Sequence, residues 1–329
     1  MTPFRLHFDT RALDTHFAGV WAARLAEWTV PAGVQVTADP AEADAILDLS
    51  SHHHLGGGRS FSVHPASHYH HWPEKTFDWD STDFPSGRMA GLYCSLSRQQ
   101  HDPARHRGFC YPWRHNAAVA LRSQSEAILL YGFSGSVSSG LRARMLAALT
   151  RTAGPDCLIR QTGSMWDRMF SGGTDPDKTR YADDLARCKF ILCPRGNGLS
   201  SIRIYEAMET GRVPVILSDR LALPECIDWS TAAVAIAERD LDRAPQLLAA
   251  RAADWPALAR SARAQWEDKF SDARLLATLA GECRRLLDLR RHARRGTTWF
   301  IPLRILPSWL LFQAKAGRRR LQRSVRRSA

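Results

Sequence analysis

The residues best suited to chemistry are two arginines and a glutamate in the middle of this 329-residue sequence. Arg195 lies in a glycine-containing turn, Pro194–Gly198, and Arg203 and Glu206 follow three residues apart in a helix-like segment. Guanidinium groups bind phosphate well, as do the free N–H groups at a helix N-terminus. A carboxylate one turn into the helix can accept hydrogen bonds from sugar hydroxyls. The pattern therefore predicts a site for a sugar-linked nucleoside diphosphate.

The elements that must position this site form one strand–helix–strand unit. Two apolar runs, Phe190–Cys193 and Val213–Leu217, flank the helical segment within about 30 residues, the usual size of a βαβ unit. Apolar residues recur on the helix at helical spacing, so one face should pack on the sheet. Ser200 or Ser201 is expected to cap the helix, and Gly211 to end it. The turn and the helix N-terminus would then meet at the carboxyl edge of a parallel sheet.

This region resembles the exostosin-type glycosyltransferases. The resemblance is carried by the Pro-Arg-Gly turn, by the run R-x-x-E-A-M-x-x-G-x-x-P-V-I-L-S-D from Arg203 to Asp219, and by Leu223–Trp229. Upstream, Tyr181–Phe190 resembles the helix that precedes the Pro-Arg-Gly strand. Ile128–Ser136 resembles the strand and glycine turn that open the nucleotide-binding domain. The similarity extends from about residue 128 to 248.

The resemblance implies an α/β fold of two Rossmann-like domains facing a cleft, the GT-B arrangement. It also implies inverting, metal-independent transfer of a sugar from a nucleotide diphosphate, most simply a UDP-sugar, to a hydroxyl. Arg195 and Arg203 would neutralise the departing diphosphate, and Glu206 would bind ribose or sugar hydroxyls. The expected donor-binding residues are Gly135, Ser136, Arg142, Arg195, Gly196, Asn197, Ser201, Arg203 and Glu206.

Several of these residues also have a simpler interpretation. Arg203 and Glu206 could form only a surface ion pair, worth a few tenths of a kcal/mol. Arg142 could be a solvated helix residue. Asp219, at a strand end, could cap the next segment or border the site. Arg195 lies in a glycine turn, where the fold is not expected to need its side chain, and this favours a catalytic role.

The general base is expected in the N-terminal half, which is rich in histidine. Seven of the 13 histidines of the chain are concentrated between residues 52 and 71: His52, His53, His54, His64, His68, His70 and His71. Asp78, Asp80 and Asp83 follow soon after. We nominate His54 and Asp80 as catalytic, because a carboxylate or imidazole can take the proton from the attacking hydroxyl. A zinc site and plain solvated loop histidines are the alternatives, and the adjacent histidines 52–54 would diverge from one another, which disfavours zinc.

Hydrophobic periodicity predicts two α/β halves. The expected strands are 4–8, 34–37, 45–49, 75–79, 92–96, 128–133, 157–161, 190–193, 213–217 and 232–236. The expected helices are 15–28, 140–150, 181–188, 240–251 and 255–270. Strands alternating with helices favour a parallel sheet in each half. The expected domains are residues 1–120, 126–275 and, for a C-terminal helix and basic tail, 276–329.

Composition indicates a reducing compartment. The seven cysteines are odd in number and scattered, which argues against a disulfide framework or a zinc knuckle. The first residues carry charges where a signal peptide needs an apolar core. No apolar run reaches the roughly 20 residues that span a bilayer. We expect a cytoplasmic protein that can bind peripherally to the inner face of the cell membrane.

Positive charge is concentrated at the C-terminus. From Arg284 to Ala329 there are fourteen Lys/Arg and one acid, which accounts for the whole net charge of +12. The apolar stretch Trp299–Phe312 lies among these basic residues and is broken by Pro302 and Pro307. Such a segment suits adsorption on an anionic lipid surface. The alternative is a helix that packs its aromatic residues on the body of the protein.

The sequence thus predicts a transferase that builds cell-surface polysaccharide or glycolipid. Its expected partners are a nucleotide-sugar donor, a glycan or lipid-linked acceptor and an anionic membrane, with no cofactor, metal or nucleic acid. Two alternatives are a nucleotide-sugar-binding protein without activity and a metal-dependent enzyme using the His52–His71 loop. A third is a scaffold that acts through its basic tail.

Overall fold

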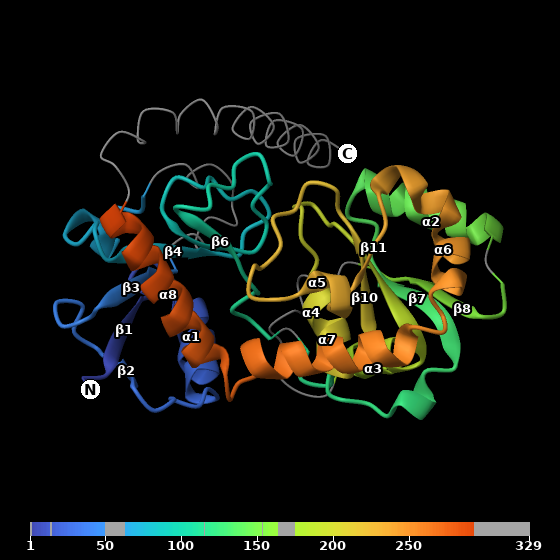
Figure 1. Cartoon of the computed structure of the whole chain (residues 1–329), viewed down its shortest axis with the longest axis horizontal. Helices are drawn as coiled ribbons and strands as arrows, with labels where there is room; N and C mark the ends of the chain where they lie inside the picture. The colour runs from blue at the N-terminus through green and yellow to red at the C-terminus, as the bar shows by residue number, and fades with distance from the viewer. Residues whose placement is uncertain are drawn as a thin grey trace, which may run out of the picture. The chain divides into compact units, whose positions relative to one another are not determined.

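The chain divides into two compact units, which we describe separately (Figure 1). The computed structural model describes residues 2–13, 15–49, 63–114, 116–152, 154–163 and 175–292. Unit 1 contains the described residues within Met1–Phe109, Arg220–Pro224 and Leu275–His292, and unit 2 contains those within Cys110–Asp219 and Glu225–Arg274. The first domain was expected to end at residue 120, whereas the first segment of unit 1 ends at Phe109.

Unit 1 is a six-stranded parallel sheet in the order β2-β1-β3-β4-β5-β6. Tryptophan and phenylalanine rings pack together on one face, where Trp21 of the first helix lies edge-on to Trp79, 6.0 Å between ring centroids. The elements are β1 Phe4–Asp9, α1 Thr15–Ala26, β2 Val34–Val36, β3 Ala45–Asp48, η2 His68–His70, β4 Thr76–Asp80, β5 Gly91–Tyr93 and β6 His106–Gly108.

The chain returns to unit 1 as helix α8, Leu275–His292. The Arg284 guanidinium lies 4.4 Å from the centre of the Phe4 ring, and Arg290 lies 4.4 Å from that of Phe77. Arg290 also donates to the carbonyl oxygens of Pro73 and Thr76. Part of the C-terminal positive charge therefore belongs to a helix packed on unit 1. The aromatic stretch 299–312 lies outside the described residues.

Unit 2 is a five-stranded parallel sheet in the order β11-β10-β9-β7-β8. Its strands are β7 Leu129–Gly135, β8 Cys157–Gln161, β9 Cys188–Pro194, β10 Val213–Leu217 and β11 Val234–Ala235. Its helices are η3 Gln124–Glu126, α2 Gly140–Thr152, α3 Pro176–Ala186, α4 Arg203–Thr210, α5 Trp229–Ala232, η5 Glu238–Arg243, α6 Ala244–Ala250 and α7 Trp255–Lys269.

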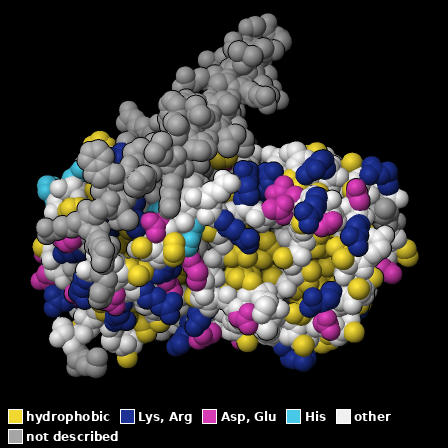
Figure 2. Space-filling model, turned by 45° about the horizontal axis from the view of Figure 1, so that its top comes forward, with side chains coloured by type: hydrophobic (Ala, Val, Ile, Leu, Met, Phe, Trp, Pro, Cys, Tyr) yellow, Lys and Arg dark blue, Asp and Glu magenta, His cyan; other side chains and the backbone are white. Residues whose placement is uncertain are grey.

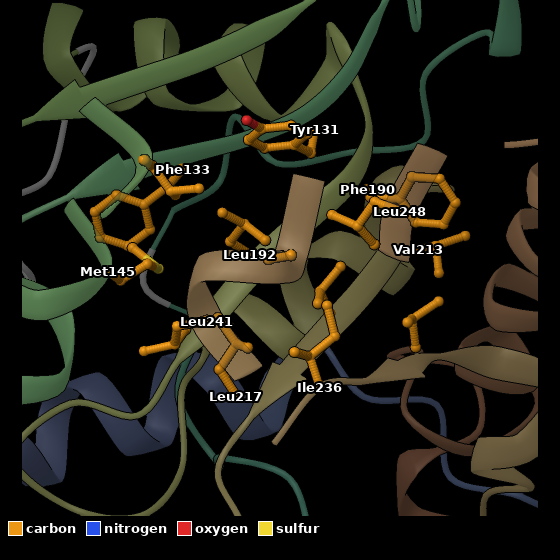
Figure 3. Packing of buried hydrophobic residues seen from close by; sticks show 14 of the residues in the cluster. Tyr131, Phe133, Met145, Phe190, Leu192, Val213, Leu217, Ile236, Leu241 and Leu248 are labelled. Atoms are coloured by element: carbon orange, nitrogen blue, oxygen red, sulfur yellow. The ribbon is translucent and has the colours of Figure 1, made fainter. Parts of the chain in front are cut away.

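One face of this second sheet carries the main hydrophobic core of unit 2 (Figure 3). Alternate residues of each strand point into it, as the period of two in a β-strand requires. Phe133, Leu192 and Leu217 from the strands meet Met145 from α2 and Leu241 from η5. Helices α3 and α4 pack against the opposite face, so the sheet is covered on both sides, as parallel sheets usually are.

The expected α/β architecture is confirmed, with local differences near the end of unit 2. The expected strand 232–236 is shortened to Val234–Ala235, because the Asp228 side chain accepts the Ser230 N–H and begins α5. The expected helix 240–251 is observed as two elements, η5 and α6, and Asp240 inside η5 has non-helical dihedral angles. Strand β6 was not expected. It has only three residues and adds an edge to the first sheet.

On the face shown in Figure 2, Lys and Arg side chains are interspersed with Asp and Glu and do not form one basic field. This agrees with a nearly neutral body outside the C-terminal stretch. Among the described helices, none combines the length and the apolar character needed to cross a bilayer.

Candidate functional site

The carboxyl ends of β7 and β9 form the switch point of the second sheet. The two strands are neighbours, but the chain leaves β7 toward the edge strand β8 and leaves β9 toward β10 on the other side. Open parallel sheets bind ligands at such points, since the diverging connections leave a crevice. Gly135 ends β7, and the Pro194–Gly198 turn begins where β9 ends. The predicted donor-binding residues therefore gather at one edge of this sheet.

Arg203, the first residue of α4, reaches back over the end of β7. Its Nε donates to the Ser134 carbonyl oxygen at 2.9 Å, and its guanidinium lies 5.1 Å from the centre of the Phe133 ring. A Cβ atom on Gly135 would lie 2.0 Å from Nη2 of Arg203. Gly135 is thus required by the guanidinium that packs against it.

Replacing Gly135 by alanine is expected to displace the Arg203 guanidinium without unfolding the protein. Gly135 is not among the residues with positive φ, so alanine fits its backbone and only the side-chain contact is lost. We expect affinity for a nucleoside diphosphate to fall at least tenfold, measured by calorimetry. Gly140→Ala is the matched control, because its Cβ would meet no atom within 4 Å. Equal affinity in both variants would contradict this role of Arg203.

Arg142 is buried, not solvated. Its exposed fraction is 7%, its Nη1 donates to the Ser136 carbonyl oxygen at 3.1 Å, and its Nη2 lies 3.4 Å from the Pro194 carbonyl oxygen. The guanidinium stands 5.9 Å from the centre of the Phe133 ring and would lie 3.3 Å from a Cβ on Gly196. The interpretation of Arg142 as a solvated residue is therefore wrong. Arg142 and Arg203 both pack on Phe133.

Glu206 is also buried, which rules out the exposed Arg203–Glu206 ion pair. Its exposed fraction is 8%, and its Oε2 accepts a hydrogen bond from the Tyr181 hydroxyl at 2.5 Å. Burial raises the pKa of Glu206, and the hydrogen bond from Tyr181 and the charge of Arg203 partly offset that rise. A buried carboxylate held in this way can accept hydrogen bonds from ligand hydroxyls.

Arg195 differs from the sequence-based expectation, because it has a structural partner. Its guanidinium binds both carboxylate oxygens of Glu238, at 2.9 Å and 3.4 Å. The Glu238 N–H in turn donates to Asp219, so Asp219 caps η5. Glu238 comes from a distant part of the sequence, and only a search for acids at the ends of later strands could have suggested it. The Arg195 charge is already balanced in this arrangement.

The predicted serine cap of α4 is wrong, whereas the glycine end is confirmed. Helix α4 begins after Ile202 with no side-chain cap, because Ser201 lies one residue too early. Gly211 has left-handed dihedral angles and ends the helix, as predicted. Within the described residues, the buried Oγ of Ser201 has no hydrogen-bond partner. The same holds for the Oγ atoms of Ser134 on β7 and Ser218 after β10.

Unpaired buried hydroxyls are costly, so their concentration at this edge indicates a place for water or a polar ligand. Asn197 is half-buried in the turn after β9, and the Gly196 N–H donates to the Ser200 carbonyl oxygen. Of the predicted donor-binding residues, Gly135, Ser136, Arg142, Gly196 and Arg203 are thus brought together around Phe133. Tyr181, which the sequence-based reasoning missed, connects Glu206 to them.

In unit 1, aspartates follow one another across neighbouring strands at the carboxyl edge. Asp9, Asp48 and Asp78 are paired in register on β1, β3 and β4, and Asp80 ends β4. Asp80 is 1% exposed and accepts the Thr82 N–H at 2.7 Å. Burial raises the pKa of Asp80 to about 6. Such a carboxylate can hold or release a proton near neutral pH.

Of the two nominated bases, only Asp80 can be located, because His54 lies outside the described residues, as do His52 and His53. His68 begins η2, where its N–H donates to Asp9 at 2.7 Å and burial lowers its pKa. Across the part of the chain that the structure describes, no three His, Cys, Asp or Glu side chains are grouped as metal ligands.

Comparison with known proteins agrees with the motifs at this site. The Exostosin GT47 domain matches residues 58–250. An exostosin-1 homolog of Caenorhabditis elegans is 43% identical over 84 residues, covering 25% of this chain and 22% of that protein. A probable glucuronosyltransferase, GUT1, of Oryza sativa subsp. japonica is 40% identical over 91 residues, covering 26% and 21%. The chain thus spans about a fifth of the length of these relatives.

Two solved structures have a distant likeness. A glycosyltransferase from Rickettsia africae covers 89% of this chain and 100% of its own, with 10% identity and a TM-score of 0.45. Anabaena Alr3699/HepE, in complex with UDP and glucose, covers 87% and 99%, with 9% identity and a TM-score of 0.43. The family match extends over more than half of the 329 residues and includes the Pro-Arg-Gly turn and α4. This chain belongs to the exostosin GT47 family.

Proposed function

We propose that this protein is an inverting glycosyltransferase that moves a sugar from a nucleoside-diphosphate donor, a UDP-sugar, to a hydroxyl of a glycan or glycolipid. The observation that carries the proposal is the arrangement of Arg203, Arg142 and Glu206 at the carboxyl edge of the second sheet. Membership in the exostosin GT47 family supports the same chemistry.

In this proposal the arginines act on the leaving group. Negative charge grows on the diphosphate as the sugar departs, and cations fixed beforehand stabilise that charge without reorganising. Arg203 stands at the N-terminus of α4, where the helix dipole adds to its effect. Arg142 is held by the carbonyl groups at the ends of both strands. Arg195 contributes less, because Glu238 balances its charge.

We further propose that Asp80 removes the proton from the attacking hydroxyl. A general base works best when its pKa lies near the working pH, and burial moves the Asp80 pKa to about 6. Glu206 would bind the ribose or sugar hydroxyls of the donor. Since cationic side chains stabilise the leaving group, the proposed reaction needs no metal. The proposed setting is cell-surface polysaccharide synthesis on the cytoplasmic side of the membrane.

Ligand-linked thermal stabilisation tests the proposal. A ligand that binds the folded state stabilises it by RT ln(1 + [L]/Kd), so UDP or its sugars should raise the melting temperature. We expect the shift to survive EDTA, to exceed that with GDP or CMP, and to disappear in Glu206→Gln, which keeps the side-chain shape. Glu209→Gln is the control, because it makes the same chemical change three residues further along the same helix.

Two results would contradict this proposal. If no nucleotide raised the melting temperature, the assignment of the donor site would be refuted. If the shift were lost on chelation, nucleotide binding would depend on a metal. Binding without transfer to any acceptor would instead support a nucleotide-sugar-binding protein without activity.

A further inference from the structure

The hydroxyl of Tyr181 is hydrogen-bonded to the carboxylate of Glu206. Tyr181 lies on α3, in the sequence between β8 and β9, and its hydroxyl donates to Oε2 of Glu206 at 2.5 Å. The Arg203 guanidinium stands 5.8 Å from the centre of the Tyr181 ring. Tyr181 thus contacts the two residues of α4 to which we assign donor binding.

This contact makes the two carboxylate oxygens of Glu206 different from each other. Tyr181 occupies Oε2, while Oε1 receives no hydrogen bond from any residue that the structure describes. A hydrogen bond to one oxygen also fixes the rotation of the carboxylate plane. The second oxygen therefore has a defined direction in which it can accept a ligand hydroxyl.

We propose that Tyr181 is a positioning residue that orients Glu206 toward the hydroxyl groups of the donor and keeps it ionised. This inference rests on the proposed function, because the hydroxyls belong to the proposed nucleotide sugar. Tyr181 itself does not touch the donor in this scheme. It acts through Glu206, as the partners behind a metal ligand or a catalytic base do.

Burial and two neighbouring groups set the charge of Glu206, and they act in opposite directions. Burial disfavours its ionised form, while the Tyr181 hydroxyl and the Arg203 guanidinium favour it. Cys193 on β9 and Glu209 on α4 also lie within electrostatic reach of Glu206. Removing the Tyr181 hydroxyl leaves Arg203 as the main stabilising group. The protonated form of Glu206 should then become more populated near neutral pH.

A carboxylate titration of the ligand-free protein tests this step directly. With glutamate labelled at the carboxyl carbon, the Glu206 signal is identified by its loss in Glu206→Gln. We expect Tyr181→Phe to raise the Glu206 midpoint, because a hydrogen bond to the ionised carboxylate favours that form and its removal disfavours it. Tyr131→Phe is the matched control, since Tyr131 is a tyrosine of the same unit that lies on β7. An unchanged midpoint in Tyr181→Phe overturns the inference.

Donor binding provides a second measurement on the same variants, with UDP as the probe. At pH 6.5 we expect Tyr181→Phe to bind UDP at least fivefold more weakly than the wild type, and most of this loss should be recovered at pH 9. Tyr131→Phe should bind as the wild type does at both pH values. A loss of equal size at both pH values would show a merely structural role for Tyr181.

The two proposals fail differently. If the wild type binds no nucleotide, the proposed function fails and the assignment of Tyr181 to donor binding fails with it, even if the Glu206 midpoint shifts. If UDP binds and Tyr181→Phe changes neither the midpoint nor the affinity, only the role of Tyr181 is refuted.

Discussion

Asp80→Asn is expected to lower the transfer rate by about 10²–10⁴-fold, the usual contribution of a general base. Asparagine keeps the shape of the side chain and an oxygen that can accept the Thr82 N–H, but it cannot take a proton. The loss should appear in kcat, while the affinity for UDP stays within about twofold, because donor binding is assigned to unit 2.

The same substitution is expected to stabilise the folded protein above pH 6. Burial raises the Asp80 pKa from 3.8 to about 6, so folding favours the protonated form. The wild type should therefore lose stability as pH rises from about 4 to 6 and remain at that lower level above pH 6. Asparagine removes this dependence, which amounts to roughly 3 kcal/mol for a shift of about two pKa units.

Initial-rate assays and urea unfolding at pH 4.5 and 8 measure the two effects on one protein. The stability gain should be present at pH 8 and small at pH 4.5. Asp83→Asn provides the comparison, since it makes the same chemical change three residues further along the chain. Full activity in Asp80→Asn would eliminate Asp80 as the base, and a loss confined to Asp83→Asn would transfer the role to that residue.

Arg212→Met is expected to destabilise the protein by about 3–5 kcal/mol, because it leaves several buried carbonyl oxygens without a donor, at a cost of about 1–3 kcal/mol each. Arg212 is fully buried and follows the end of α4. Its guanidinium donates to the carbonyl oxygens of Ala186, Gly211 and Ser123, three points far apart in sequence. Methionine fills much of the space but leaves these carbonyl groups without donors. Because the carbonyl groups belong to the backbone, no second substitution can remove them.

Thermal unfolding monitored by circular dichroism measures this effect. A loss of that size should lower the melting temperature by roughly 10 °C, at 2–4 °C per kcal/mol for a unit of this size. Arg144→Met is the control, because Arg144 is exposed on α2 and its removal should change stability little. A decrease of less than 2 °C in Arg212→Met would show that water replaces the guanidinium.

Much of the fold could be predicted because its elements are locally specified. The strands Cys157–Gln161 and Val213–Leu217 have the predicted bounds, since short apolar runs bounded by turn residues are typical of buried strands. The end of α4 was predictable because glycine alone tolerates its left-handed angles easily. The start of α4 was not, because several serines precede it and propensity does not distinguish between them.

The candidate site was predictable only in part, for a similar reason. Arg203 and Glu206 were identified because their spacing and the surrounding motif lie within one segment of sequence. Tyr181 and Glu238 were missed, because each meets its partner only after the strands and helices have packed together. Arg142 was undervalued, since nothing local indicates whether a helix arginine points to solvent or to the ends of two strands.

The sequence by itself determined the alternation of strands and helices, the glycine turns and the family to which the chain belongs, because these depend on neighbouring residues. Only the tertiary structure decided which charges are balanced. Arg195 is held by Glu238, whereas Arg203 packs on Phe133 and the Gly135 backbone at the edge of the sheet. The pKa of Asp80 was also decided there, because the cost of ionising a carboxylate depends on the whole environment that buries it.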